Sequence, residues 1–188
     1  MEQSIAYGMS PYALTEKLNG EGYNMTIEEG KRLYSSYEKD FDVGIRFLRN
    51  AGEQALRDGK LKNLGGRMRY WAVPSSADRN KYPNGMRDES FIGKCKAIKR
   101  EGGNFLIQSV NADMTKQAMI YIRRYKKLHN VRTEFMNQVY DEIVTRTHKD
   151  DSESFHKAKQ KMMIEAAGKY LKNIPMEVEG NVGRSWTK

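Results

Sequence analysis

Apolar residues recur at helical spacing through most of this chain, and the alternation typical of strands is confined to short stretches. Pro11 predicts a bend or a restart in the first helix, because proline has no backbone amide to donate. The Thr-Ile-Glu-Glu sequence at 26–29 is a capping box, which predicts where the second helix begins. Helices are predicted over residues 4–18, 26–40, 43–57, 89–128 and 150–171.

Runs rich in β-branched and aromatic residues predict two hairpins and a closing strand. The strands are predicted over residues 60–64, 68–73, 131–139, 143–147 and 175–179. The first hairpin turns at the Gly-Gly pair 65–66, and the second turns at Asp141 and Glu142. A second Gly-Gly pair at 102–103 predicts an interruption or strain in the long fourth helix, since each glycine costs about 1 kcal/mol relative to alanine. An antiparallel sheet with helices packed on it places the chain in the α+β class.

The composition shows an excess of basic residues, and the sequence contains neither a membrane-spanning run nor the cysteines for an internal disulfide. The 188 residues suffice for one modest core, so one domain or a part of one is expected. Lysine and arginine number 33 against 24 aspartate and glutamate residues, and the resulting charge of +9 favours a polyanionic partner. Cys95 is the sole cysteine, which excludes an internal disulfide and fits a reducing compartment. No apolar run has the length of a membrane span and no signal-peptide core opens the chain, so a cytoplasmic protein without a membrane partner is expected.

Two adjacent carboxylates stand where the second predicted hairpin bends. Asp141 and Glu142 lie between short strand-forming runs, so a hairpin would concentrate their negative charge at one edge. Solubility does not require such a concentration, whereas a divalent cation is bound well by it. Aspartate is also common in plain surface turns, so a structural turn is the alternative interpretation.

Polar residues that suit a nucleic acid recur along the long fourth helix. Lys96, Arg100, Asn104 and Gln108 are spaced four apart and therefore share one stripe of the helix. Two cations and two amides match a partner that presents phosphates and base edges, and amides can donate to the acceptors that every base pair offers in the minor groove. The glycines at 102–103 would permit the close approach of a backbone. A solvated polar face with a local kink is the alternative.

Four blocks, in order and at about the right spacing, resemble the family A, polymerase-I-like DNA polymerases. Gln-Val-Tyr-Asp-Glu at 138–142 is similar to motif C, whose usual form is Gln-Val-His-Asp-Glu. Ile-Ala-Tyr-Gly-Met-Ser at 5–10 resembles the end of motif B on the fingers helix, and residues 100–119 resemble the long palm helix. Residues 175–186 resemble the closing strand and the terminal tryptophan. The resemblance covers almost the whole chain and implies part of the fingers and palm of a polymerase right hand, with an antiparallel palm sheet and packed helices.

The resemblance also implies a role for individual residues. Asp141 would bind the metal in a two-metal site for Mg²⁺, and Glu142 would support that site. Tyr7 and Gly8 would lie near the nascent base pair, with a core tyrosine as the alternative for the first. Primer–template contacts would come from Arg67, Arg100, Asn104, Gln108, Gln138 and Tyr140. Tyr140 replaces the usual histidine, so the site keeps a hydrogen-bond donor but loses the option of a positive charge near neutral pH.

Part of the family pattern is missing from this chain. Motif A, the Asp-Tyr-Ser-x-x-Glu strand, would lie upstream of motif B, and the chain begins inside motif B. Leu-Tyr-Ser-Ser-Tyr-Glu at 33–38 lacks the leading aspartate and is predicted to be ordinary helix. We therefore expect a C-terminal subunit or fragment, with fingers helices over 1–58 and one palm unit over 59–188. If the polymerase is of phage type, its place is the host cytoplasm.

Such a chain is expected to be active only with a polypeptide that carries motif A and the rest of the fingers, acting on primer–template DNA and deoxynucleoside triphosphates. One alternative is a non-catalytic basic DNA-binding protein derived from a polymerase. Another is a piece of a longer product.

Overall fold

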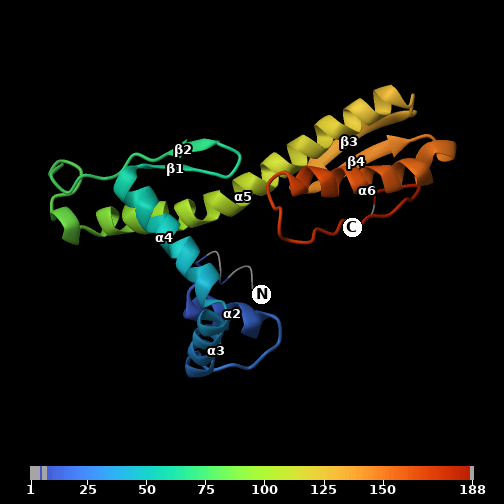
Figure 1. The fold of residues 1–188 in the computed structure, drawn as a ribbon. Helices are drawn as coiled ribbons and strands as arrows, with labels where there is room; N and C mark the ends of the chain where they lie inside the picture. Colours follow the sequence, from blue (N-terminus) through green and yellow to red (C-terminus); the bar gives the residue numbers. More distant parts are fainter. Residues whose placement is uncertain (1–4, 6–7, 187–188) are drawn as a thin grey trace. The chain divides into compact units, whose positions relative to one another are not determined.

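The computed structural model describes residue 5 and residues 8–186, and most of this part of the chain is helical (Figure 1). The helices are α2 (Pro11–Gly20), α3 (Ile27–Asp40), α4 (Asp42–Asp58), α5 (Glu89–Leu128) and α6 (Ser152–Gly168), with 3-10 turns η1 (Gly85–Arg87) and η2 (Lys149–Asp151). The strands are β1 (Lys60–Lys62), β2 (Met68–Tyr70), β3 (Thr133–Val139) and β4 (Glu142–Thr147), which form two separate antiparallel hairpins. The predicted α+β class is confirmed. None of the helices just named is long and apolar enough to cross a membrane.

The chain divides into two compact units, Met1–Ile107 and Gln108–Lys188. This division falls inside α5, whereas the sequence predicts one after residue 58 and a single unit beyond it. The assignment of residues 1–58 to the fingers and 59–188 to the palm stays a prediction.

Local sequence signals position the first two described helices. α2 begins at Pro11, as the predicted restart requires, and its N-cap Ser10 accepts a hydrogen bond through Oγ from the Ala13 amide at 3.2 Å. α3 opens with the predicted capping box, in which the side chains of Thr26 and Glu29 each bind the other residue's backbone amide.

α4 crosses α5 so closely that side chains larger than hydrogen do not fit where the helices touch (Figure 1). A Cβ atom added to Gly52 would lie 2.4 Å from the Lys99 carbonyl oxygen, and one added to Gly102 would lie 2.5 Å from the Ala55 Cβ. The predicted interruption of α5 is wrong, because the close packing offsets the cost of glycine in a helix and α5 continues through it. Around this crossing, the buried residues are Ala51, Ala55, Leu61, Ile98 and Phe105.

The β1–β2 hairpin belongs to the same unit. The buried Asn63 closes its loop by accepting a hydrogen bond through Oδ1 from the Arg67 amide at 2.8 Å, and Gly66 in that loop has a φ of 85°. Beyond β2, Trp71 Nε1 donates to Glu101 Oε2 of α5 at 3.0 Å, and the Arg69 guanidinium pairs with the same carboxylate. The predicted second strand over 68–73 ends early at Tyr70, because its partner β1 begins at Lys60, directly after the Gly59 cap of α4.

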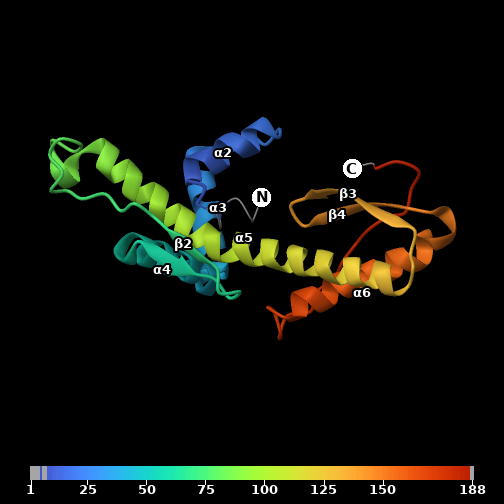
Figure 2. The same ribbon diagram turned by 90° about the horizontal axis from the view of Figure 1, so that it is seen from above.

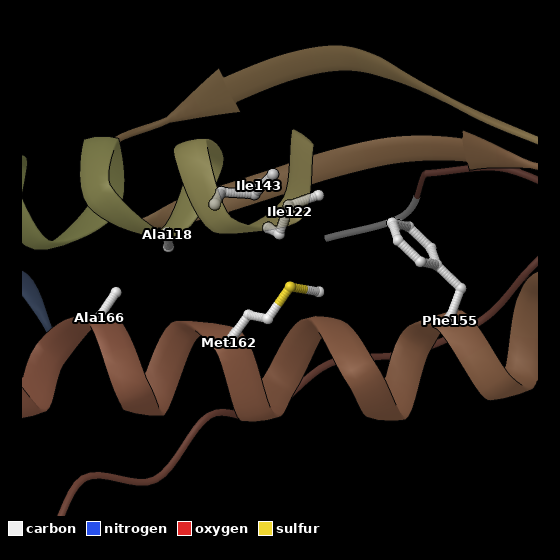
Figure 3. Packing of buried hydrophobic residues seen from close by; sticks show 6 residues of the cluster. All are labelled: Ala118, Ile122, Ile143, Phe155, Met162 and Ala166. Atoms are coloured by element: carbon white, nitrogen blue, oxygen red, sulfur yellow. The ribbon is translucent and has the colours of Figure 1, made fainter. Parts of the chain in front are cut away.

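The second unit contains the C-terminal half of α5, the β3–β4 hairpin and α6 (Figure 1, Figure 2). Figure 3 shows the core where side chains from both helices face one another beside Ile143 of β4. Its buried residues are Ala118, Ile122, Ile143, Phe155, Met162 and Ala166. Arg132 Nε donates to Asp151 Oδ2 at 2.9 Å and thereby lowers the pKa of the Asp151 carboxyl, and the Asp151 side chain makes no capping hydrogen bond to α6.

Residues 169–186 follow α6 without a helix or a strand. The predicted closing strand over 175–179 is wrong, because the segment pairs with a side chain and not with a neighbouring strand: Gln160 Nε2 of α6 donates to the Val178 carbonyl at 2.9 Å. The segment then returns to the β3–β4 hairpin, where Trp186 contacts Glu142.

Candidate functional site

The β3–β4 hairpin ends in a two-residue loop that carries the first predicted metal ligand. Val139 pairs with Glu142, so Tyr140 and Asp141 form the loop, one residue earlier than the predicted turn at Asp141 and Glu142, and Glu142 is the first residue of β4. Tyr140 has a φ of 53°, in the left-handed region that residues other than glycine rarely adopt, and the residue is 87% exposed. Gln138 Nε2 donates to the Tyr140 carbonyl at 2.6 Å and so holds this loop from β3. Asp141 is therefore exposed at the tip of a short, internally bonded turn.

Two side chains from distant parts of the chain reach the start of β4. Trp186 Nε1 donates to Glu142 Oε1 at 2.8 Å. Lys159 Nζ of α6 donates to the Ile143 carbonyl at 3.2 Å, and burial of the ammonium lowers the pKa of Lys159 while the charge of Glu142 opposes that shift. The Lys159 ammonium thus binds backbone and not the carboxylates of the turn.

The acidic turn has the donors that Mg²⁺ prefers but forms only part of a complete site. Carboxylate oxygens are hard ligands that suit this cation, and Asp141 and Glu142 are both exposed. Within the part of the chain that the structure describes, no group of three or more histidine, cysteine, aspartate or glutamate residues is placed to hold a metal. The turn can therefore contribute ligands to a cation, and further ligands would have to come from elsewhere.

In the first unit, the polar stripe residues Arg100 and Asn104 lie on the helix face opposite the α4 crossing. Arg100 and Gln108 are exposed and Asn104 is half-buried, whereas Gly102 and Phe105 are buried. With about 3.6 residues per turn, Gly102 points away from the side of Arg100. The glycines thus approach the α4 backbone, and the stripe stays accessible to a partner.

The structure brings Gly8 to Arg100, which the sequence did not predict. Gly8 has a φ of 91°, and a Cβ atom added to it would lie 3.5 Å from Arg100 Cγ. A side chain at this position would be strained because of the positive φ, while its Cβ would make an ordinary van der Waals contact with the arginine. Tyr7 lies outside the described residues.

The predicted site residues that the structure describes fall in two groups, one in each unit. Gly8, Arg100 and Asn104 lie in the first unit together with Arg67, whose exposed side chain extends from the β1–β2 loop. The second unit contains the predicted site residues Gln108, Gln138, Tyr140, Asp141 and Glu142. Each group is therefore organised by its own unit.

Two residues next to the acidic turn had no predicted role. Lys159 interrupts the apolar face of α6, four residues after Phe155 and three before Met162, and this break in periodicity was a usable signal. The role of Trp186 depends on a chain return across 44 residues, which no local pattern shows.

Comparisons with known proteins cover the whole chain. The family model described as DNA polymerase family A matches residues 1–188. DNA polymerase I of Mycobacterium leprae is 29% identical over 187 residues, which are 99% of this chain and 18% of that protein. The thermostable DNA polymerase I of Thermus aquaticus is 27% identical over 182 residues, or 97% of this chain and 19% of the relative. The chain thus spans under a fifth of the length of these two curated relatives.

A solved structure has a similar fold. It is described as the POL domain of Pol1 from M. smegmatis in complex with DNA primer-template and dNTP, and it is 27% identical to this chain. The match has a TM-score of 0.68 and covers 87% of this chain and 26% of the other.

Proposed function

The chain belongs to DNA polymerase family A, and we propose that it contributes the motif C carboxylates and primer–template contacts to template-directed DNA synthesis. The observation that carries the proposal is the exposed acidic turn at Tyr140 and Asp141, which lies in a chain matched to the family over its full length. Its proposed substrates are deoxynucleoside triphosphates and primer–template DNA, the ligand classes in the description of the similar M. smegmatis structure.

In this proposal Asp141 binds Mg²⁺ and Glu142 supports the same site. When bound, the metal would stabilise the negative charge that develops on the transferring phosphoryl group. The protein's own contribution is to present the carboxylate oxygens in a defined place. Gln138 does this by holding the Tyr140 carbonyl, and Tyr140 would contact the primer end with its exposed phenol.

The stripe on α5 supplies the proposed DNA contacts. Arg100 is exposed and can donate to phosphates, and Asn104 and Gln108 can donate to acceptors in the minor groove. Such contacts depend on duplex geometry more than on sequence, which suits an enzyme that copies any template. Arg67, Tyr7 and Gly8 are proposed to complete the DNA and nucleotide contacts.

We further propose that catalysis needs a polypeptide that carries motif A and the rest of the fingers. A two-metal site holds two cations about 4 Å apart, and each of them needs oxygen ligands of its own. Asp141 and Glu142 are sequence neighbours, and among the described residues no larger cluster of potential ligands forms around them. The second carboxylate is therefore expected from motif A.

A non-catalytic DNA-binding role is the second candidate, favoured by the net charge of +9 and the exposed Arg100 stripe. The two candidates share the DNA face and differ in whether Asp141 is needed.

Primer extension with Mg²⁺ tests the proposal. The purified chain alone should not extend a primer, and addition of a motif A-bearing polymerase fragment should restore extension. In the restored enzyme, Asp141→Asn should lower the extension rate by at least about 10²-fold, because a charge at the transition state is lost. Primer–template affinity should change little, and Glu142→Gln should be milder.

Glu165→Gln, at an exposed position of α6, is the matched control and should leave extension unchanged. Robust extension by the chain alone would contradict the requirement for motif A. Normal extension by Asp141→Asn would instead favour the non-catalytic candidate.

A further inference from the structure

The irregular segment after α6 is attached to the rest of its unit at defined points. Gln160 Nε2 of α6 donates to the Val178 carbonyl at 2.9 Å. Gly180 lies against His156, so that an added Cβ atom would be 2.8 Å from the His156 Cε1. The segment reaches the hairpin at Trp186, whose Nε1 donates to Glu142 Oε1 at 2.8 Å. An irregular segment thus places the indole of Trp186 against the carboxylate of Glu142.

We propose that Trp186 is a positioning residue for the motif C carboxylates, an inference that rests on the proposed function. Glu142 is exposed, and without a partner its side chain would sample several rotamers. The indole N–H holds one oxygen of Glu142, while the second oxygen stays available to a cation or a water molecule beside Asp141.

The chemistry of the donor supports this assignment. An indole N–H is a donor without a net charge, so it orients Glu142 and leaves the negative charge of the turn intact. A lysine or arginine at this place would form an ion pair and compete with the metal. The nearby ammonium of Lys159 instead donates to the Ile143 carbonyl at 3.2 Å and to Thr145 Oγ1 at 3.5 Å. The arrangement therefore orders Glu142 and keeps its charge.

A purely structural role for Trp186 is the competing explanation. The residue is 50% exposed, so it buries only part of its surface against the rest of the unit. Trp186→Phe separates the two roles, because phenylalanine keeps an aromatic ring and removes the N–H. Trp71→Phe is a matched control, since it removes the other indole, which donates to Glu101 Oε2 at 3.0 Å in the first unit.

The contact is tested on the chain alone by NMR of its two tryptophan indole N–H signals. Glu142→Ala should shift the Trp186 signal and speed its exchange with water, while the Trp71 signal stays in place. A Trp186 signal that does not respond to Glu142→Ala would overturn the proposal.

The positioning role is tested in the enzyme restored with a motif A-bearing fragment. Trp186→Phe should raise the Mg²⁺ concentration for half-maximal extension several-fold with primer–template affinity unchanged, and Trp71→Phe should not. In a Glu142→Ala background, Trp186→Phe should have no further effect, because both changes remove one interaction. An unchanged Mg²⁺ requirement, or fully additive effects, would overturn it.

Failure of the proposed function has a different signature. If the unmodified mixture does not extend primers, Mn²⁺ added to the chain alone decides the positioning role. Broadening of the Trp186 signal that Asp141→Asn abolishes would support it, and a Trp186 signal that Glu142→Ala leaves in place would overturn it.

Discussion

The two compact units hold their proposed functional residues by different physical means. In the first unit, α5 is pressed against α4 through glycines, and the Arg100 stripe lies on the opposite face of α5. In the second, the acidic turn is held by single hydrogen bonds from Gln138 and Trp186. Steric packing therefore positions Arg100 and Asn104 in the first unit, whereas hydrogen bonds from single side chains position the acidic turn in the second.

This difference predicts how each region fails. Overpacking a close helix crossing costs typically about 1–3 kcal/mol, because backbone atoms must move. The net contribution of one hydrogen bond is about 0.5–1.5 kcal/mol, because water replaces a lost partner at an exposed site. Changes at the crossing should thus affect global stability, and changes at the tethers should affect mainly the local order of the turn.

The largest effect is expected from alanine at the crossing. Gly52→Ala places a Cβ atom 2.4 Å from the Lys99 carbonyl oxygen, which belongs to backbone and cannot rotate away. We expect the free energy of unfolding to fall by about 1–3 kcal/mol or more in chemical denaturation. Gly93→Ala, where no atom lies within 4 Å of the added Cβ, is the matched control on α5 and should gain up to about 1 kcal/mol. Equal effects at the two positions would refute the close crossing.

A smaller effect is expected from removing a charge on the accessible stripe. Arg100→Ala should weaken primer–template binding and lower the slope of log Kd against log salt concentration by about 1. The reason is that the variant makes one phosphate contact fewer, so its binding releases fewer counterions. Lys99→Ala, one residue away on another face and paired with Glu53 at 2.6 Å, is the control and should keep the slope. Identical slopes for Arg100→Ala and the unmodified chain would show that DNA binds another surface. Fluorescence anisotropy with labelled DNA over a salt series measures both.

The smallest expected effect is a dependence of the unfolding free energy on pH that comes from Lys159. Burial lowers the pKa of Lys159 below its ordinary value of 10.5, so between those two values the unfolded chain binds more protons than the folded chain. At neutral pH the buried, charged lysine therefore lowers the free energy of unfolding, and this loss is recovered as pH rises toward 10.5. Unfolding free energies across this window should rise for the unmodified chain relative to Lys159→Met. A pH-independent difference between the two proteins would contradict the burial of this ammonium.

Local chemistry explains which features of the fold could be predicted from the sequence. The capping box at Thr26, the helix restart at Pro11 and the left-handed Gly59 that ends α4 each depend on residues within one turn of one another. The acidic hairpin was predictable for the same reason, since its turn and strands are adjacent in sequence. The family resemblance also followed from short blocks in order, and the match over residues 1–188 confirms it.

Two of the wrong predictions concern segments whose partners are distant. An interruption was expected in α5 because isolated glycines weaken a helix, and α4 supplies the packing that compensates. A closing strand was expected over 175–179, but a strand exists only with a hydrogen-bonded neighbour, and Gln160 meets this segment with a side chain instead.

The sequence by itself thus determined the helices, the two hairpins, the acidic turn and the family. Only the tertiary structure decided which face of α5 is covered, that Gly8 lies against Arg100, and that Trp186 returns to Glu142. The physical reason is one of range. Caps, turns and periodicity act over a few bonds along the chain, whereas packing and long-range hydrogen bonds join residues that only the folded backbone brings together.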